Sequence, residues 1–119
     1  MRLVPVPLLV ALALLSCGGD DPIGPQTNTC TGTCIVVQNQ SVSLDVTVVQ
    51  FSNCGITDWG PNRLDGGRLQ PGGSRGWNVT AGCWDMQALA RSGNTTYSSA
   101  SFGVDIVSGQ SYILVFSPP

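Results

Sequence analysis

The segment WDMQALAR, residues 84–91, decides the fold because its side chains alternate along its whole length. Trp84, Met86, Ala88 and Ala90 fall on one side, and the residues between them are Asp85, Gln87, Leu89 and Arg91. A period of two places successive side chains on opposite faces of a β-strand. The segment therefore predicts a strand with one apolar face.

The same alternation recurs in shorter segments on both sides of residues 84–91. Further strands are predicted from these apolar residues: Ile35–Val37; Val42, Leu44, Val46 and Val48; Trp77 and Val79; Phe102, Val104 and Ile106; Tyr112, Leu114 and Phe116. Turn-forming residues separate them, at Pro71–Gly73, Ser92–Asn94 and Ser108–Gln110, and no segment has the period of a helix. Short strands at this spacing predict an all-β fold, a single immunoglobulin-like β-sandwich of about six or seven antiparallel strands over residues 30–119.

The charged residues exclude several classes of function. The chain contains five arginines and seven aspartates, and it has no lysine, glutamate or histidine. No basic stripe is available to neutralise phosphates, so nucleic acid is excluded as a partner. Without histidine there is no histidine-dependent catalytic triad and no Cys/His zinc site. We expect neither a metal site nor a cofactor.

The N-terminus has the features of a targeting segment. Met1-Arg2 precedes thirteen residues, Leu3–Leu15, that are apolar apart from two prolines. A helix needs about 20 residues to span a bilayer, whereas a shorter run suits the apolar region of a signal peptide. Residues 17–29 are rich in Gly, Pro and Asp, which predicts a flexible tether before the domain.

The segment LLSC, residues 14–17, resembles the lipobox of bacterial lipoproteins. The resemblance implies that cleavage follows Ser16, so that residues 1–16 are removed and Cys17 becomes a lipid-modified N-terminus. Two or three acyl chains there anchor a small domain stably, because each buried methylene contributes about 0.8 kcal/mol. Gly18 stands where an aspartate favours the inner membrane, so the resemblance implies the outer membrane. The alternative is a plain signal peptide with a coincidental cysteine.

A second resemblance covers about residues 35–117. Trp59–Leu64 (WGPNRL), Gly82–Ala88 (GCWDMQA) and Phe102–Ile106 (FGVDI) occur in that order. This pattern resembles a recurrent small β-sandwich domain of bacterial secreted proteins and lipoproteins. Thr80–Gly82 departs from it, because the group has prolines there. The resemblance implies the fold and carries no particular activity.

The five cysteines divide into one lipid attachment point and four that can pair. With Cys17 lipidated, four cysteines allow three pairings. Cys54 follows one predicted strand and Cys83 opens another, so both fall near one end of the sandwich, and the two also occur together in the resembling domain. We therefore favour Cys54–Cys83 with Cys30–Cys34. A four-cysteine metal site is the alternative, although its spacing is poor for zinc and export favours oxidation.

The longest irregular segment, residues 52–70, holds the candidate surface site. It contains Trp59 together with the charged residues Asp58, Arg63 and Asp65. Exposed loops carry function more often than strands do. The other two tryptophans of the chain lie on predicted strands and are expected in the core. Trp59 is therefore the aromatic residue expected at the surface.

These features together predict a binding or structural module rather than an enzyme. The expected partners are the membrane, through the anchor at Cys17, and an envelope protein or a glycan at the loop. One alternative is a small carbohydrate-binding module on Trp59, and another is a calcium site on Asp58 and Asp65, although a contact between aspartate and Arg63 is expected instead. A third alternative is a histidine-free hydrolase that uses the same two carboxylates.

Overall fold

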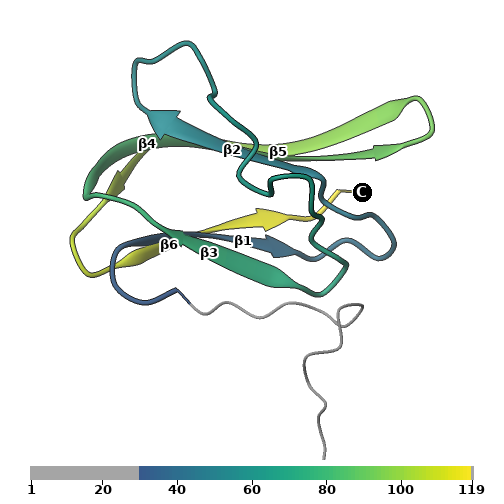
Figure 1. Cartoon of the computed structure of the whole chain (residues 1–119), viewed down its shortest axis with the longest axis horizontal. Helices are drawn as coiled ribbons and strands as arrows, with labels where there is room; N and C mark the ends of the chain where they lie inside the picture. The colour runs from purple at the N-terminus through teal and green to yellow at the C-terminus, as the bar shows by residue number, and fades with distance from the viewer. Residues whose placement is uncertain (1–29, 119) are drawn as a thin grey trace, which may run out of the picture.

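Six strands form two sheets that lie face to face (Figure 1). The computed structural model describes residues 30–118, so the predicted signal peptide, Cys17 and the tether lie outside the described residues. The strands are β1 (Cys34–Asn39), β2 (Val48–Asn53), β3 (Ser74–Asn78), β4 (Gly82–Ser92), β5 (Thr95–Ile106) and β6 (Ser111–Phe116). The sheet orders are β3-β1-β6 and β2-β4-β5. The predicted all-β class is confirmed, and within residues 30–118 no helix is long and apolar enough to cross a membrane.

Residues 84–91 lie in β4, the central strand of its sheet, as their alternation predicts. The side chains on the Trp84 face are all buried, and those on the Asp85 face are half-buried or exposed. β4 pairs in the antiparallel direction with β2 on one side and β5 on the other. Both edges of β4 are therefore occupied, and its register fixes which residues of β2 and β5 share the outer face.

The core fills the space between the two sheets. Its members from the strands include Ile35, Val37, Val49, Phe51, Met86, Ala88, Leu114 and Phe116. The ring of Phe51 lies 5.8 Å from that of Trp77 and 5.9 Å from that of Trp84, between centroids. Trp84 is buried and Trp77 packs against the same cluster. The core position expected for the two strand tryptophans is confirmed.

One ladder differs from the predicted antiparallel arrangement. β1 and β6 pair in parallel, from Cys34 opposite Ser111 to Asn39 opposite Phe116. A tight turn forces neighbouring strands to run antiparallel, but these are the first and last strands, and no turn joins them. The prediction is therefore wrong for this pair, whereas the other three ladders are antiparallel.

The strand predicted over residues 42–48 is wrong in its start and in part of its apolar face, of which Val46 is buried as expected and Val42 is not. β2 begins only at Val48, its buried side chains are Val49 and Phe51, and Val42 is 97% exposed. The preceding residues form a loop in which Val46 pairs with Leu69 of another loop through an isolated antiparallel bridge, and the side chain of Val46 is buried in the core. The alternation in this part of the sequence does not correspond to a strand.

The buried side chain of Asn39 organises this loop. Its Nδ2 donates to the carbonyl oxygens of Leu44 and Leu69, at 2.7 and 2.8 Å. Its Oδ1 accepts from the backbone N–H and the hydroxyl of Ser41, at 3.0 and 2.6 Å. Side-chain bonds to nearby backbone compete with a β ladder. They hold the chain in a turn where alternation alone predicts extension.

Both favoured disulfides are present. Cys54–Cys83 joins the end of β2 to the start of β4, with the two Cα atoms 5.4 Å apart. Cys30–Cys34 fixes the chain where it enters β1, with a Cα separation of 6.4 Å. The predicted pairing is confirmed. The four sulfurs form two disulfide bonds, so none of them is a free thiolate for a four-cysteine metal site.

Candidate functional site

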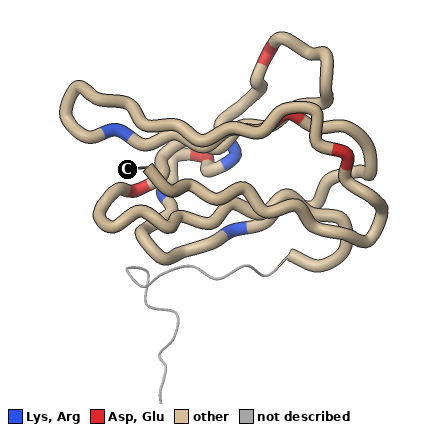
Figure 2. Tube along the Cα trace, turned by 180° about the vertical axis from the view of Figure 1, so that it is seen from behind, with Lys and Arg blue, Asp and Glu red and all other residues tan. Residues whose placement is uncertain are grey.

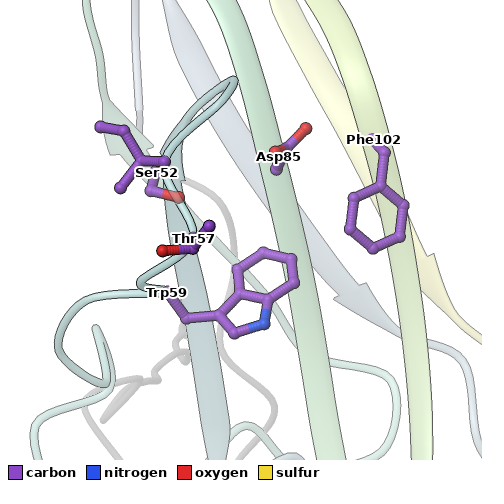
Figure 3. Close-up of a pocket in the computed structure, with 6 residues that line it drawn as sticks. Ser52, Thr57, Trp59, Asp85 and Phe102 are labelled. Carbon is purple, nitrogen blue, oxygen red and sulfur yellow. The ribbon is translucent and has the colours of Figure 1, made fainter.

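An open pocket of about 260 Å³ lies on the outer face of the sheet β2-β4-β5 (Figure 3). Three strands and one loop supply its lining, which consists of Ser52 on β2, Ile56, Thr57 and Trp59 on the loop after β2, Asp85 on β4 and Phe102 on β5. The loop rises from the sheet at the end opposite the β4–β5 turn (Figure 1). Adjacent paired strands hold the floor of the pocket, so its geometry is set by the sheet.

A β-bulge turns Phe102 toward this pocket. Two residues of β5, Phe102 and Gly103, lie opposite the single residue Asp85 of β4. Gly103 has a φ of 64°, and its N–H donates to Oδ1 of Asp85 at 2.8 Å. The extra residue reverses the alternation, so Phe102 is outward and 67% exposed. The prediction that Phe102 shares a face with Val104 and Ile106 is therefore wrong, because the bulge shifts the period by one residue.

Trp59 and Phe102 form the apolar part of the pocket. Their ring centroids lie 5.7 Å apart and their planes are tilted by 51°. The indole extends from its loop across β4 toward Phe102, next to Asp85 (Figure 3). Two tilted rings in contact offer aromatic faces at an angle to each other beside a carboxylate. Of the residues predicted for the site, Trp59 is the one that lines this pocket.

The loop that carries Trp59 is held on both sides of it. On one side, the Cys54–Cys83 disulfide ties the loop to β4. On the other, Gln50 Nε2 donates to the Gly60 carbonyl at 2.9 Å, and the Gly60 N–H donates to Oδ1 of Asp58 at 3.0 Å. The carboxylate of Asp58 therefore shapes the turn next to Trp59, and it is not among the lining residues.

Arg63 is placed away from the pocket. Its Nη2 donates to the Phe51 carbonyl at 3.1 Å, and its guanidinium carbon lies 4.2 Å above the centroid of the Phe51 ring. Its backbone N–H donates to the Val49 carbonyl at 2.7 Å. The half-buried side chain thus covers the edge of β2 and does not join Trp59 at a common surface.

Asp58 and Asp65 do not form a built site. Both are exposed, neither lines the pocket, and Asp65 has a φ of 53° in a turn. Within residues 30–118 no group of three or more histidine, cysteine or acidic side chains lies close enough to hold a metal ion. Neither carboxylate is therefore brought to the pocket, and neither belongs to a group of three potential metal ligands within residues 30–118.

Asp85 and Phe102 are the site residues that sequence reasoning did not identify. Asp85 has the pattern of an ordinary outward polar residue on a strand, so alternation gives it no distinction. For Phe102 one signal was present, because a glycine inside a strand often marks a bulge, and Gly103 follows it directly. Ser52 falls at the start of the predicted loop, but its role depends on its pairing with Asp85 across the sheet.

The pocket carries a single charge, which is negative. Among its lining residues only Asp85 is ionisable. The arginines of the described chain do not cluster (Figure 2), and Arg68 forms an ion pair with Asp45 at 3.1 Å. An anionic ligand would meet a carboxylate and no guanidinium, so the site suits a neutral or a cationic ligand.

The chemistry available in the pocket is thus two aromatic rings, one aliphatic side chain, two hydroxyls and one carboxylate. These groups can bind and orient a small ligand without a metal. No protein family, curated protein or solved structure matches the chain.

Proposed function

We propose that this chain is a lipid-anchored protein of the bacterial cell envelope, whose immunoglobulin-like β-sandwich presents a ligand-binding pocket. The observation that carries the binding role is the meeting of Trp59, Phe102 and Asp85 on the outer face of one sheet. Concave apolar surfaces with a few oriented polar groups are the usual form of ligand sites. Large aromatic side chains that remain accessible next to such groups supply contact area for a partner.

The pocket supports binding rather than catalysis. General acid–base or nucleophilic catalysis by carboxylates uses a pair with opposed roles, and this pocket contains one carboxylate. The chain has no histidine to act in place of the second group. One oxygen of Asp85 is already engaged by the N–H of Gly103. Binding, by contrast, needs only shape and a few placed hydrogen-bonding groups.

The anchor is supported by the sequence of residues 14–17 and by the geometry of the domain. A tether of thirteen residues, 17–29, reaches about 45 Å when extended. It would join the domain at Cys30, which the disulfide to Cys34 fixes to β1. β1 belongs to one sheet, and the pocket lies on the outer face of the other (Figure 1). An anchored domain would thus present the pocket on the layer that does not carry the tether.

Co-sedimentation with isolated envelopes of the producing bacterium tests the binding role. The protein is the processed chain, residues 17–119, with Cys17→Ser, which lacks both the apolar signal segment and the lipid attachment point. We expect Trp59→Ala to weaken envelope binding about tenfold, the loss of about 1.4 kcal/mol of contact. Arg91→Ala is the matched control, since this exposed residue lies on the same face of β4, about 20 Å along the strand from Asp85. Equal sedimentation of Trp59→Ala and the unsubstituted protein would contradict the proposal.

A further inference from the structure

We propose that the pocket takes a neutral glycan, with one sugar ring seated against Trp59 and Phe102. This inference rests on the binding role proposed above and names the class of ligand. Three features support it. They are the polar groups of the pocket that have unused hydrogen-bonding capacity, the negative charge of Asp85, and the polar residues next to the pocket on the same face of the sheet.

Four polar groups of the pocket have unused hydrogen-bonding capacity. In the part of the chain that the structure describes, the hydroxyls of Ser52 and Thr57 and the indole N–H of Trp59 make no hydrogen bond. Asp85 uses Oδ1 to accept from the N–H of Gly103, which leaves Oδ2 to accept from a ligand. The set therefore contains three groups that can donate and one carboxylate oxygen that only accepts.

A sugar ring matches this combination of groups. Each of its hydroxyls both donates and accepts, so it can pair with Ser52, with Thr57, or with the carboxylate of Asp85. Its ring C–H groups form apolar faces with slightly positive hydrogens, which are attracted to the negative face of an aromatic ring. Trp59 and Phe102 provide such faces beside the polar groups. One ring can therefore satisfy the apolar and the polar lining together.

Charged ligands fit less well. An anion would face Asp85 with no basic side chain among the lining residues. An organic cation would be attracted to Asp85 and to the aromatic faces. A simple ammonium ion only donates, so it can bond to Asp85 and to the hydroxyl oxygens of Ser52 and Thr57, but it offers no acceptor to the indole N–H of Trp59. A ligand that bears hydroxyl groups can bond to all four polar groups.

The outer face of the sheet extends the polar surface beyond the pocket. Ser52 lies opposite Asp85, and in the next outward row Gln50 lies opposite Gln87. The two glutamine side chains are hydrogen-bonded, Nε2 of Gln87 to Oε1 of Gln50 at 2.7 Å. Amides in this position can bond to the hydroxyls of an adjoining sugar. The pocket, at about 260 Å³, is smaller than the sites of drug-sized ligands, so one ring occupies it and the neighbouring sugar lies over the glutamine pair.

The test uses the carbohydrate that remains after isolated envelopes have been digested with protease and extracted with organic solvent. The protein is the processed chain, residues 17–119, with Cys17→Ser, and binding is measured by co-sedimentation with this insoluble carbohydrate and with untreated envelopes. We expect the unsubstituted pocket to bind both materials. Trp59→Ala and Asp85→Asn should each weaken binding to both about tenfold, while Arg91→Ala binds normally. Asp85→Asn keeps an oxygen for the N–H of Gly103, and far-UV circular dichroism checks that each variant is folded.

The outcomes separate this inference from the proposed function. If untreated envelopes bind in a Trp59-dependent manner and the residual carbohydrate does not bind, the ligand is a protein or a lipid. The glycan inference is then overturned, and the binding role stands. If Trp59→Ala and Asp85→Asn bind untreated envelopes as well as the unsubstituted pocket, the binding role itself is overturned. Binding of the residual carbohydrate that both substitutions weaken supports the inference.

Discussion

The amide of Asn39 connects two loops that lie far apart in sequence. It donates to the carbonyl of Leu44 in one loop and to that of Leu69 in the other, and Ser41 satisfies its oxygen. A fully buried polar group is tolerated because all of these bonds are made. The path of residues 40–47, and with it the point at which β2 begins, therefore depends on one side chain.

Substitution of this residue should be costly. Asn39→Ala removes two buried hydrogen bonds, although the Leu44 carbonyl still accepts from the Ser41 hydroxyl and the Leu69 carbonyl from the Val46 N–H. We expect the free energy of unfolding to fall by about 1–3 kcal/mol. Denaturant unfolding of the unsubstituted and substituted proteins measures the difference. Gln40→Ala is the control, since Gln40 is exposed and its side chain donates to the side chain of Gln38 on the surface. A loss for Asn39→Ala no larger than that for the control would contradict the role of the amide.

Alternation predicts which face a side chain occupies at some positions of the sheet and not at others. Residues 84–91 follow their pattern because a central strand with one buried face leaves no freedom in register. Phe102 does not, because one inserted residue at Gly103 reverses every side chain beyond it. Asp85 gains its place in the pocket from that bulge and from Trp59, which lies on a different segment. Such a meeting depends on tertiary contacts that a period of two does not contain.

At the scale of elements, the loop after β2 has two parts with different roles. Residues 60–70 cover the free edge of β2, where Asn62 Oδ1 accepts from the Val49 N–H at 3.0 Å and Asn62 Nδ2 donates to the Thr47 carbonyl at 2.9 Å. Covering an edge strand in this way protects it from pairing with other chains. Residues 54–59 are left to form the wall of the pocket. The prediction of a functional surface over residues 52–70 therefore includes structural residues such as Arg63.

The disulfide at the start of this loop is expected to support both stability and binding. Replacing Cys54 and Cys83 with alanine should lower the free energy of unfolding by about 3–4 kcal/mol, from the entropy of the loop of 29 residues that it closes. It should also weaken envelope binding, because Trp59 loses one of its fixed neighbours. Thermal unfolding and co-sedimentation measure the two effects.

The other disulfide is the matched control for this pair. Replacing Cys30 and Cys34 with alanine opens a loop with a sequence separation of 4, so we expect a loss of about 2 kcal/mol. Envelope binding should not change, since this disulfide lies on β1, in the sheet that does not form the pocket. Equal effects of the two pairs on binding would contradict the role given to Cys54–Cys83.

A strand or a pairing could be predicted where nearby residues determine it, and could not where contacts between distant parts of the chain determine it. Strand number and class follow from alternation and turn residues, and both are confirmed. The parallel pairing of β1 with β6 is a contact between the two ends of the domain, and no turn or spacing specifies it. The Cys54–Cys83 pairing could be predicted because the two cysteines flank predicted strand ends and also occur together in the resembling domain.

At the scale of the whole molecule, the proposed anchor and the proposed binding surface fall on different sheets. The Cys30–Cys34 disulfide lies at the entry of β1, and the pocket lies over β2-β4-β5. The core between the sheets connects them as one body. This separation leaves the pocket accessible when the N-terminal side of the domain is held near a lipid surface.

The central claim, that the chain is a lipid-anchored envelope protein, is tested most directly by the intact mass of the protein extracted from membranes. We expect a chain that lacks residues 1–16 and carries diacylglycerol and acyl groups on Cys17. Its mass should also be lower by four hydrogens, two for each disulfide. A mass that retains residues 1–16, or one that fits a chain without lipid on Cys17, would contradict the claim.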